Sequence, residues 1–182
     1  MKKRVILKRY VIHILAVSAI SPDTFDLPEE QYALILCTER TNRYLNPERV
    51  LHKIVIPFPD AEDKTVPGAF TGAHARAIIR FLLALPESVT DLFIVCSKGG
   101  SRSPALAAAI LKGSERSDND VWSNPFYVPN TLVYRRTCLE LGIFMPMIAV
   151  KLKKWKNDRQ FKNAKKRRSP GEYERWMILN LW

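Results

Sequence analysis

The stretch DLFIVCSKGGSRSPALAAAIL places a thiol and a fixed positive charge on either side of a short, glycine-bearing turn. The thiol is Cys96 and the charge is Arg102, so the spacing is Cys-x5-Arg. Cysteine attacks as the thiolate, and a free thiol with a pKa of about 8.5 is only slightly ionised at neutral pH. Cys96 can therefore act as a nucleophile only if its surroundings stabilise the anion.

Three features of this stretch would stabilise an anion at Cys96. The apolar run before it predicts a strand, and the residues after the turn predict a helix, whose N-terminus carries partial positive charge. Glycines in the turn allow its backbone N–H groups to form a concave nest, beside the guanidinium of Arg102. The same nest suits a phosphate group, two of whose oxygens the arginine could bind. The candidate phosphate-binding residues are Ser97, Lys98, Gly99, Gly100, Ser101 and Arg102.

The motif CSKGGSRS resembles the phosphate-binding loop (P-loop) of cysteine-dependent protein tyrosine phosphatases, in their compact dual-specificity and prokaryotic forms. The resemblance extends roughly from Val11 to Gly142 and is specific from Ile54 to Leu111. It implies a hydrolase that forms a phosphocysteine intermediate and needs no metal or other cofactor. Cys96 would attack phosphorus and Arg102 would bind the phosphate. By the same resemblance, Ser103 would hydrogen-bond the thiolate and ease its departure.

The resemblance also implies a general acid a few tens of residues before the nucleophile. Asp60, in the segment PFPDAED, stands 36 positions before Cys96, and Asp63 stands 33 before it. We favour Asp60 because it directly follows a predicted strand, and Asp63 is the alternative. The family usually has histidine immediately before the nucleophile, where this chain has Val95. Cys96 could therefore be less acidic, or its loop looser, than in the family.

Strands and helices alternate around these residues, which predicts an α/β fold. We expect a phosphatase-like, mostly parallel central sheet of four to five strands, flanked by helices, with a basic helical C-terminal extension. Predicted strands are residues 11–20, 33–40, 52–60 and 91–96; predicted helices are 68–86, 103–113 (N-cap Ser103, then Pro104) and 130–142 (N-cap Asn130, stop Gly142); 114–125 is expected to be a loop.

The 182 residues suggest a catalytic domain over 1–146 and an extension over 147–182. The chain has a net charge of +11, and the segment from Lys151 to Arg168 has ten basic residues against the single acid Asp158. This segment is either a solvated helix face or disordered arm, a contact for nucleic acid or an acidic partner, or a docking site for an anionic surface. The apolar residues after it (Trp176, Ile178, Leu179 and Trp182) favour burial on the domain or at a dimer contact, and the oligomeric state stays open.

Cysteine usage favours a reducing compartment, and we expect a cytoplasmic protein. Three cysteines form neither a disulfide framework nor a metal-binding spacing, and three histidines supply a zinc site poorly. The N-terminus resembles a secretory signal, but Lys8 and Arg9 interrupt its apolar run, so a buried first strand is preferred. No stretch approaches the roughly 18 apolar residues of a transmembrane segment.

The expected function is metal-independent hydrolysis of phosphomonoesters, with a phosphorylated protein as substrate and tyrosine or dual specificity. RNA 5′ ends and inositol phosphates are alternative substrates. A non-catalytic phosphate-binding pseudophosphatase is a second hypothesis, which Val95 favours. A nucleic-acid-binding protein with a phosphatase-like core is a third. A rhodanese-type sulfurtransferase would leave Asp60 without a role.

Overall fold

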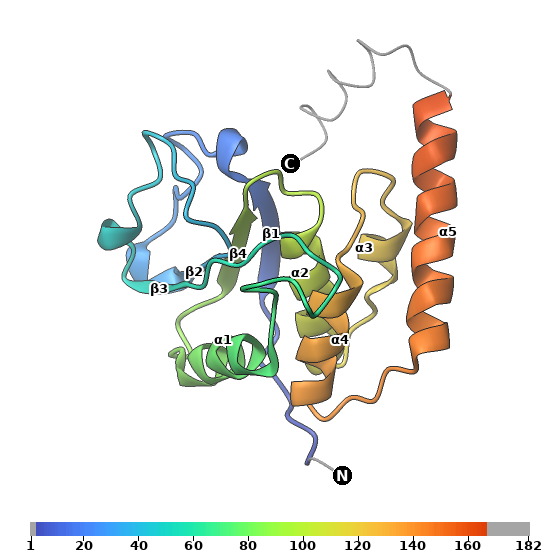
Figure 1. Cartoon of the computed structure of the whole chain (residues 1–182). Coiled ribbons are helices and arrows are strands. Elements are labelled where there is room, and N and C mark those ends of the chain that lie inside the picture. Colours follow the sequence, from blue (N-terminus) through green and yellow to red (C-terminus); the bar gives the residue numbers. More distant parts are fainter. Residues whose placement is uncertain (1–2, 167–182) are drawn as a thin grey trace.

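Four parallel strands form the sheet at the centre of the structure, a computed structural model that describes residues 3–166 (Figure 1). Their order across the sheet is β1-β4-β2-β3. The strands are β1 (Val11–Ala16), β2 (Tyr32–Leu36), β3 (His52–Val55) and β4 (Asp91–Cys96). The predicted α/β class, with a parallel sheet of four strands flanked by helices, is confirmed.

Strand β4 lies between β1 and β2, where both of its edges are hydrogen-bonded. Its apolar run DLFIVC is buried from Leu92 to Cys96, as a parallel strand covered on both faces requires. All strands end at the same edge of the sheet, because they are parallel. The segments that follow β2, β3 and β4 therefore meet at this edge, which is the usual place for a ligand site in such folds.

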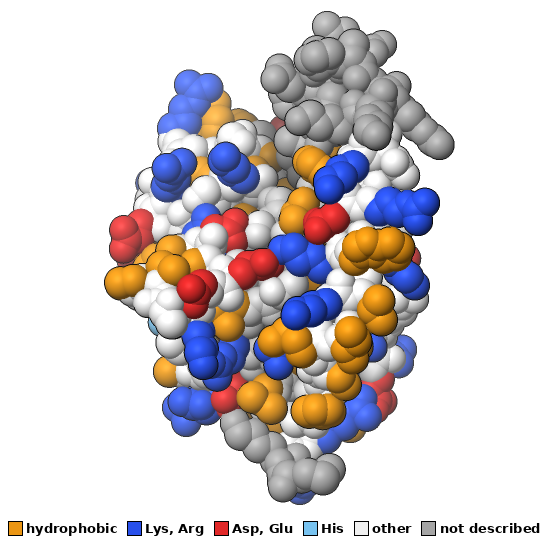
Figure 2. Space-filling view, turned by 45° about the vertical axis from the view of Figure 1, so that its right-hand side comes forward, with side chains coloured by type: hydrophobic (Ala, Val, Ile, Leu, Met, Phe, Trp, Pro, Cys, Tyr) orange, Lys and Arg blue, Asp and Glu red, His pale blue; other side chains and the backbone are white. Residues whose placement is uncertain are grey.

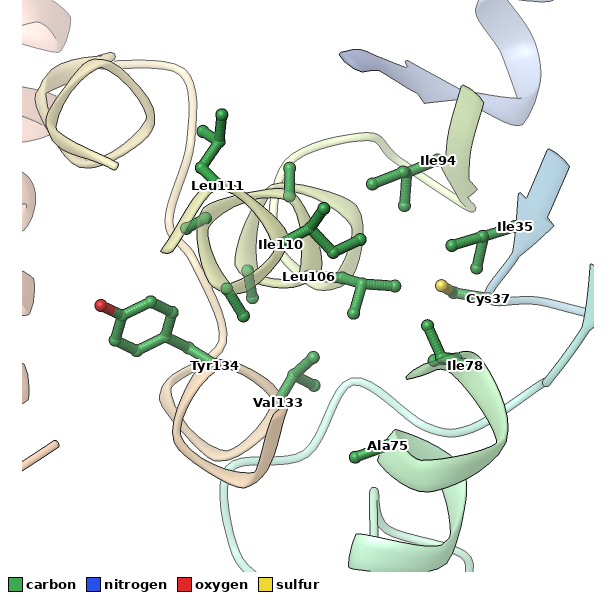
Figure 3. Packing of buried hydrophobic residues seen from close by; sticks show 14 of the residues in the cluster. Ile35, Cys37, Ala75, Ile78, Ile94, Leu106, Ile110, Leu111, Val133 and Tyr134 are labelled. Atoms are coloured by element: carbon green, nitrogen blue, oxygen red, sulfur yellow. The ribbon is translucent and has the colours of Figure 1, made fainter. Parts of the chain in front are cut away.

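Helices lie on one side of the sheet (Figure 1). They are α1 (Gly72–Ala84), α2 (Arg102–Gly113), α3 (Asn119–Ser123), α4 (Thr131–Glu140) and α5 (Met147–Lys166). Of these, α1, α2 and α4 contribute to the core on this side, and α5 packs outside on α3 and α4. Figure 3 shows α2 packed between the sheet and α4, with Leu106 and Ile110 among side chains from both. Alanines at 105 and 107–109 are fully buried, and their small size lets α2 be enclosed on several sides.

The opposite face of the sheet is covered by irregular segments rather than by α-helices. Alternate residues of the strands, including Leu34, Phe93 and Val95, pack there against Val17, Ile20, Leu45 and Val50. Short 3₁₀ turns at Val17–Ala19, Glu29–Gln31 and Pro47–Arg49 lie in these segments. Strand β1 therefore ends at Ala16 and not at residue 20, because the apolar residues after it are buried in a turn.

Helix α2 begins earlier than the sequence predicted. Its N-cap is Ser101, so Arg102 is the first helical residue and Ser103 lies inside the first turn. The prediction of Ser103 as N-cap is wrong. It assumed that Pro104 is the first helical residue, but proline is tolerated throughout the first turn, where N–H groups have no intrahelical partner. The shift turns the Ser103 side chain towards the core, where it is fully buried.

One helix was not predicted, whereas another begins where the sequence predicted. The expected loop at 114–125 contains α3, whose Val121 and Trp122 are buried, and five residues are too few for a clear helical period. Helix α4 begins as predicted, with the Asn130 side chain accepting from the N–H groups of Leu132 and Val133. Strand β4 has the predicted bounds, β2 begins one residue earlier and ends at Leu36, and β3 and α1 are shorter than predicted.

Helix α5 packs along α3 and α4 through one side. Val150 and Asn157 are fully buried there, and the Asn157 amide donates to the carbonyls of Trp122 and Asn124. Lys153 lies 3.1 Å from the buried carboxylate of Asp118. The apolar residues predicted to be buried at 176–182 lie outside the described residues. Within 3–166, none of the helices has the length and apolar character needed to cross a membrane.

Candidate active site

The turn after β4 bends sharply against the backbone of β1. Gly99 has a φ of +67°, and a Cβ added there would lie 2.8 Å from the backbone nitrogen of Ala16. A side chain at this position would thus be strained twice, once by its φ angle and once by contact with rigid backbone. Gly100 is different, since an added Cβ would meet no atom closer than 3.6 Å.

We expect Gly99→Ala to lower the free energy of unfolding by about 2 kcal/mol or more, because both strains act on the folded state only. Gly100→Ala is the matched control and should cost less than about 1 kcal/mol. Urea unfolding followed by circular dichroism measures both. Equal stability of the two variants would contradict the close approach of the loop to β1.

The backbone of the loop is held from outside by the segment before α4. The carbonyls of Gly100 and Ser101 accept hydrogen bonds from the N–H groups of Val128 (2.7 Å) and Asn130 (3.3 Å). In a trans peptide the N–H points opposite to the carbonyl, so the N–H groups of Ser101 and Arg102 point away from that segment. Within the described residues, the N–H groups of 97–101 donate no hydrogen bond to the protein.

Cys96 ends β4 beneath this loop. Its Sγ lies 3.1 Å from Oγ of Ser103, and both residues are buried. The neighbouring thiol, Cys37, follows β2 and is also buried; burial, together with the charge of Cys96, raises its pKa and outweighs the opposing effect of Arg102. Cys37 is therefore a neutral thiol beside Cys96, and all three cysteines are free.

The guanidinium of Arg102 is fixed by one of its terminal nitrogens. Nη1 donates to the carbonyls of Cys37 (2.8 Å) and Phe58 (2.7 Å), which follow β2 and β3. The other edge, formed by Nε and Nη2, is the one that can bind two oxygens of one anion. Nη2 donates to Oγ of Ser97 at 2.9 Å, whereas Nε is buried with no partner in the described structure. An unpaired buried donor of this kind suits an anionic ligand.

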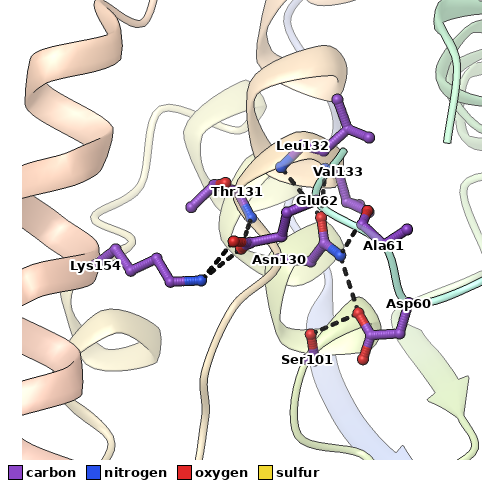
Figure 4. Close-up of polar contacts among 9 residues, drawn as sticks. All are labelled: Asp60, Ala61, Glu62, Ser101, Asn130, Thr131, Leu132, Val133 and Lys154. Carbon is purple, nitrogen blue, oxygen red and sulfur yellow. Dashed lines mark hydrogen bonds and ion pairs between the residues drawn. The ribbon is translucent and has the colours of Figure 1, made fainter. Parts of the chain in front are cut away.

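Asp60 lies next to the loop. Its Oδ1 accepts from Oγ of Ser101 (2.8 Å) and from Nδ2 of Asn130 (2.9 Å), as Figure 4 shows. Asn130 also donates to the carbonyl of Ala61 and caps α4, so one buried amide connects the Asp60 segment to a helix N-terminus. The sequence predicted Asn130 only as a cap, because nothing local indicates its contact with a residue 70 positions away.

Glu62 connects the Asp60 segment to α5 (Figure 4). Its carboxylate lies 2.6 and 2.7 Å from Nζ of Lys154 and accepts from the N–H of Thr131. Burial alone would raise the pKa of Glu62, but these hydrogen bonds outweigh it and hold the pKa below its ordinary value of 4.5. The ion pair therefore favours the present position of the segment when Glu62 is ionised.

We expect Glu62→Gln to lower the free energy of unfolding by about 1 kcal/mol at pH 7. Because the folded pKa is depressed, this stabilisation is present above the unfolded pKa and is lost as the pH falls through the folded value. The difference from the unmutated chain should thus shrink below pH 4.5. Glu48→Gln, at a surface pair with Lys53, is the control and should change little. A difference that persists in acid would contradict the ion pair.

A cavity of about 470 Å³ lies in front of the loop. Cys96, Arg102 and Asp60 contribute to its wall, together with Ser97, Lys98, Gly100 and Ser101 of the loop. Gly99 faces β1 instead. The remaining wall is basic at Arg40 and apolar at Phe126, Val128 and Phe161, the last from α5. Sequence reasoning did not find these four residues, because they come from segments without a motif.

The other candidate residues lie elsewhere. Asp63 is exposed, accepts from the N–H of Thr65 and lines a different pocket, near Arg135 and Phe144. Val95 is fully buried on the opposite face of the sheet, among Leu15 and Leu36, where an apolar side chain fits. Among residues 3–166, no group of three His, Cys, Asp or Glu side chains is placed to hold a metal ion.

A search against protein-family models finds no match for this chain, and a search of curated proteins finds no significantly similar sequence. A functional assignment therefore depends on the residues and their geometry.

Proposed function

We propose that this protein hydrolyses phosphomonoesters through a phosphocysteine intermediate, as a phosphatase of the tyrosine or dual-specificity type. The observation that carries the proposal is the set of groups around one cavity. A cysteine, the unpaired Nε of an arginine and a carboxylate all contribute to the site, beside a loop whose N–H groups bind nothing else within the described residues. These are the groups that transfer of a phosphoryl group to sulfur requires.

In the first step the Cys96 thiolate attacks phosphorus and the bond from phosphorus to the leaving oxygen breaks. The loop N–H groups and the Nε–Nη2 edge of Arg102 stabilise the charge on the three other oxygens. Asp60, protonated, gives its proton to the leaving oxygen. Both hydrogen bonds to this carboxyl group go to Oδ1, so Oδ2 is available for the proton.

In the second step water attacks the phosphocysteine and the bond between phosphorus and sulfur breaks. Asp60, now ionised, takes a proton from that water. The thiolate leaves and accepts a hydrogen bond from Ser103, whose Oγ lies 3.1 Å from Sγ. Inorganic phosphate is released and Cys96 returns to its starting form.

The position of Asp60 supports it over Asp63 as the general acid. Asp60 lines the same cavity as Cys96, and Asn130 and Ser101 hold its carboxylate in place. Asp63 lies in another pocket and is engaged by Thr65.

The apolar wall supports an aromatic leaving group. Phe126, Val128 and Phe161 would contact a tyrosine ring, which favours phosphotyrosine in a protein over inositol phosphates or RNA 5′ ends. Lys98 and Arg40 would attract acidic residues beside it.

The test is hydrolysis of para-nitrophenyl phosphate in the presence of EDTA, with and without vanadate. We expect metal-independent turnover, inhibition by vanadate and a loss of about 100-fold in Arg102→Lys, which lacks the second donor edge. Phosphotyrosine peptide should be cleaved with a higher kcat/KM than inositol phosphate or 5′-phosphorylated RNA. Tight vanadate binding without any turnover would instead support a phosphate-binding pseudophosphatase.

A further inference from the structure

A stripe of large apolar side chains runs along the outer side of α5. Ile148, Leu152 and Trp155 are 66%, 52% and 57% exposed, and their spacing of four and three residues places them on one helix face. Phe144, 80% exposed, precedes the helix. Side chains of this size are rarely exposed together without a partner.

This stripe is separate from the contacts that fix the helix. Val150, Lys153, Lys154, Asn157 and Phe161 form the opposite side, which packs against the domain, pairs with its acids or lines the cavity. The outer side chains thus stay available on a helix that is already held in place.

The fully exposed charges of α5 between 147 and 164 are positive. Lys151, Lys156, Arg159 and Lys162 are exposed, and the one acid between 147 and 164, Asp158, is only partly exposed. Arg159 lies over the ring of Trp155, 5.8 Å from its centre. Figure 2 shows basic and apolar side chains alternating on this part of the surface. The face therefore combines apolar and cationic groups along its length.

The combination of apolar and cationic groups on this face favours some classes of binding partner over others. A second copy of this face would place lysines against lysines. Nucleic acid would use the cations and Trp155, but it gives Ile148 and Leu152 no apolar contact. An anionic bilayer accepts both kinds of group, with apolar side chains below the headgroups and lysines at their phosphates. We propose that the outer face of α5 docks on a bilayer containing anionic lipid. This proposal is independent of the activity proposed above.

The test is sedimentation of the full chain with vesicles of phosphatidylcholine, alone or mixed with phosphatidylserine. We expect binding to the mixed vesicles that weakens with salt. Ile148→Ser/Leu152→Ser/Trp155→Ser should weaken it at least about tenfold. Lys151→Gln/Lys156→Gln should weaken it roughly fivefold per lysine.

The matched control changes three equally exposed apolar residues elsewhere, Ile6→Ser/Leu51→Ser/Leu83→Ser, and should bind as the unmutated chain does. Absence of binding to the mixed vesicles, or full binding by the α5 serine variant, would overturn the proposal. So would tight binding of an RNA oligonucleotide, lost in the lysine variant but not in the serine variant, in place of vesicle binding. Para-nitrophenyl phosphate turnover, measured in parallel without vesicles, reports separately on the proposed activity.

Discussion

Cys96→Ser should reduce the hydrolysis of para-nitrophenyl phosphate by a factor on the order of 10⁴ or more. A serine hydroxyl is far less acidic than a thiol, and none of the described residues that line the cavity is a histidine that could take the proton. The side chain that hydrogen-bonds Sγ is Ser103, at 3.1 Å. The rest of the cavity, including Arg102 and the loop, is unchanged by the substitution. Vanadate or phosphate should therefore still bind, which isothermal titration calorimetry can measure.

The control for this variant is Cys138→Ala, which removes another buried thiol from α4, outside the cavity. Its kcat should stay within about twofold of the unmutated value, since its thiol touches no reacting atom. Residual activity in Cys96→Ser above one-tenth of the unmutated rate would exclude Cys96 as the nucleophile.

Asp60→Asn should lower kcat by a factor on the order of 10³ for a substrate with a poor leaving group, such as phosphotyrosine. The asparagine oxygen can still accept from Ser101 and Asn130, so the geometry is kept while the transferable proton is lost. The loss should be smaller for para-nitrophenyl phosphate, whose leaving group needs less protonation. The basic limb of the pH–rate profile should disappear with the proton donor.

Asp63→Asn is the matched control, because this carboxylate lies three residues away but outside the cavity. It should leave both substrates within about twofold of the unmutated rate. A loss that depends on the leaving group in Asp63→Asn, and not in Asp60→Asn, would assign the acid to Asp63 and contradict the arrangement described above.

The core of the fold could be predicted because its pattern is local. Strand β4 has the predicted bounds, since an uninterrupted apolar run between Asp91 and Cys96 fits a strand buried on both faces. Asn130 caps α4 through a side chain that accepts from adjacent backbone, and α2 ends at Gly113 as predicted. Thiol, glycine turn and arginine within one short stretch predict an anion site, and Cys96, Gly100 and Arg102 do line one cavity.

What the sequence did not indicate depends on contacts between distant segments. Phe126 and Phe161 reach the cavity from α3's following segment and from α5, and no local pattern marks either as a wall residue. The contact of Asn130 with Asp60 and the pair of Glu62 with Lys154 join positions 70 and 92 residues apart. The N-cap of α2 was assigned two residues late because both Ser101 and Ser103 suit that position.

In the proposed mechanism, phosphate is transferred to the sulfur of Cys96. The most direct test is to mix the protein with para-nitrophenyl phosphate in EDTA, quench within the first turnover and locate the phosphate by peptide mass spectrometry. We expect a phosphate adduct on the peptide that contains Cys96, formed together with a burst of nitrophenol. Turnover with the phosphate adduct on another residue would contradict this mechanism. So would turnover that forms no adduct and requires a metal ion.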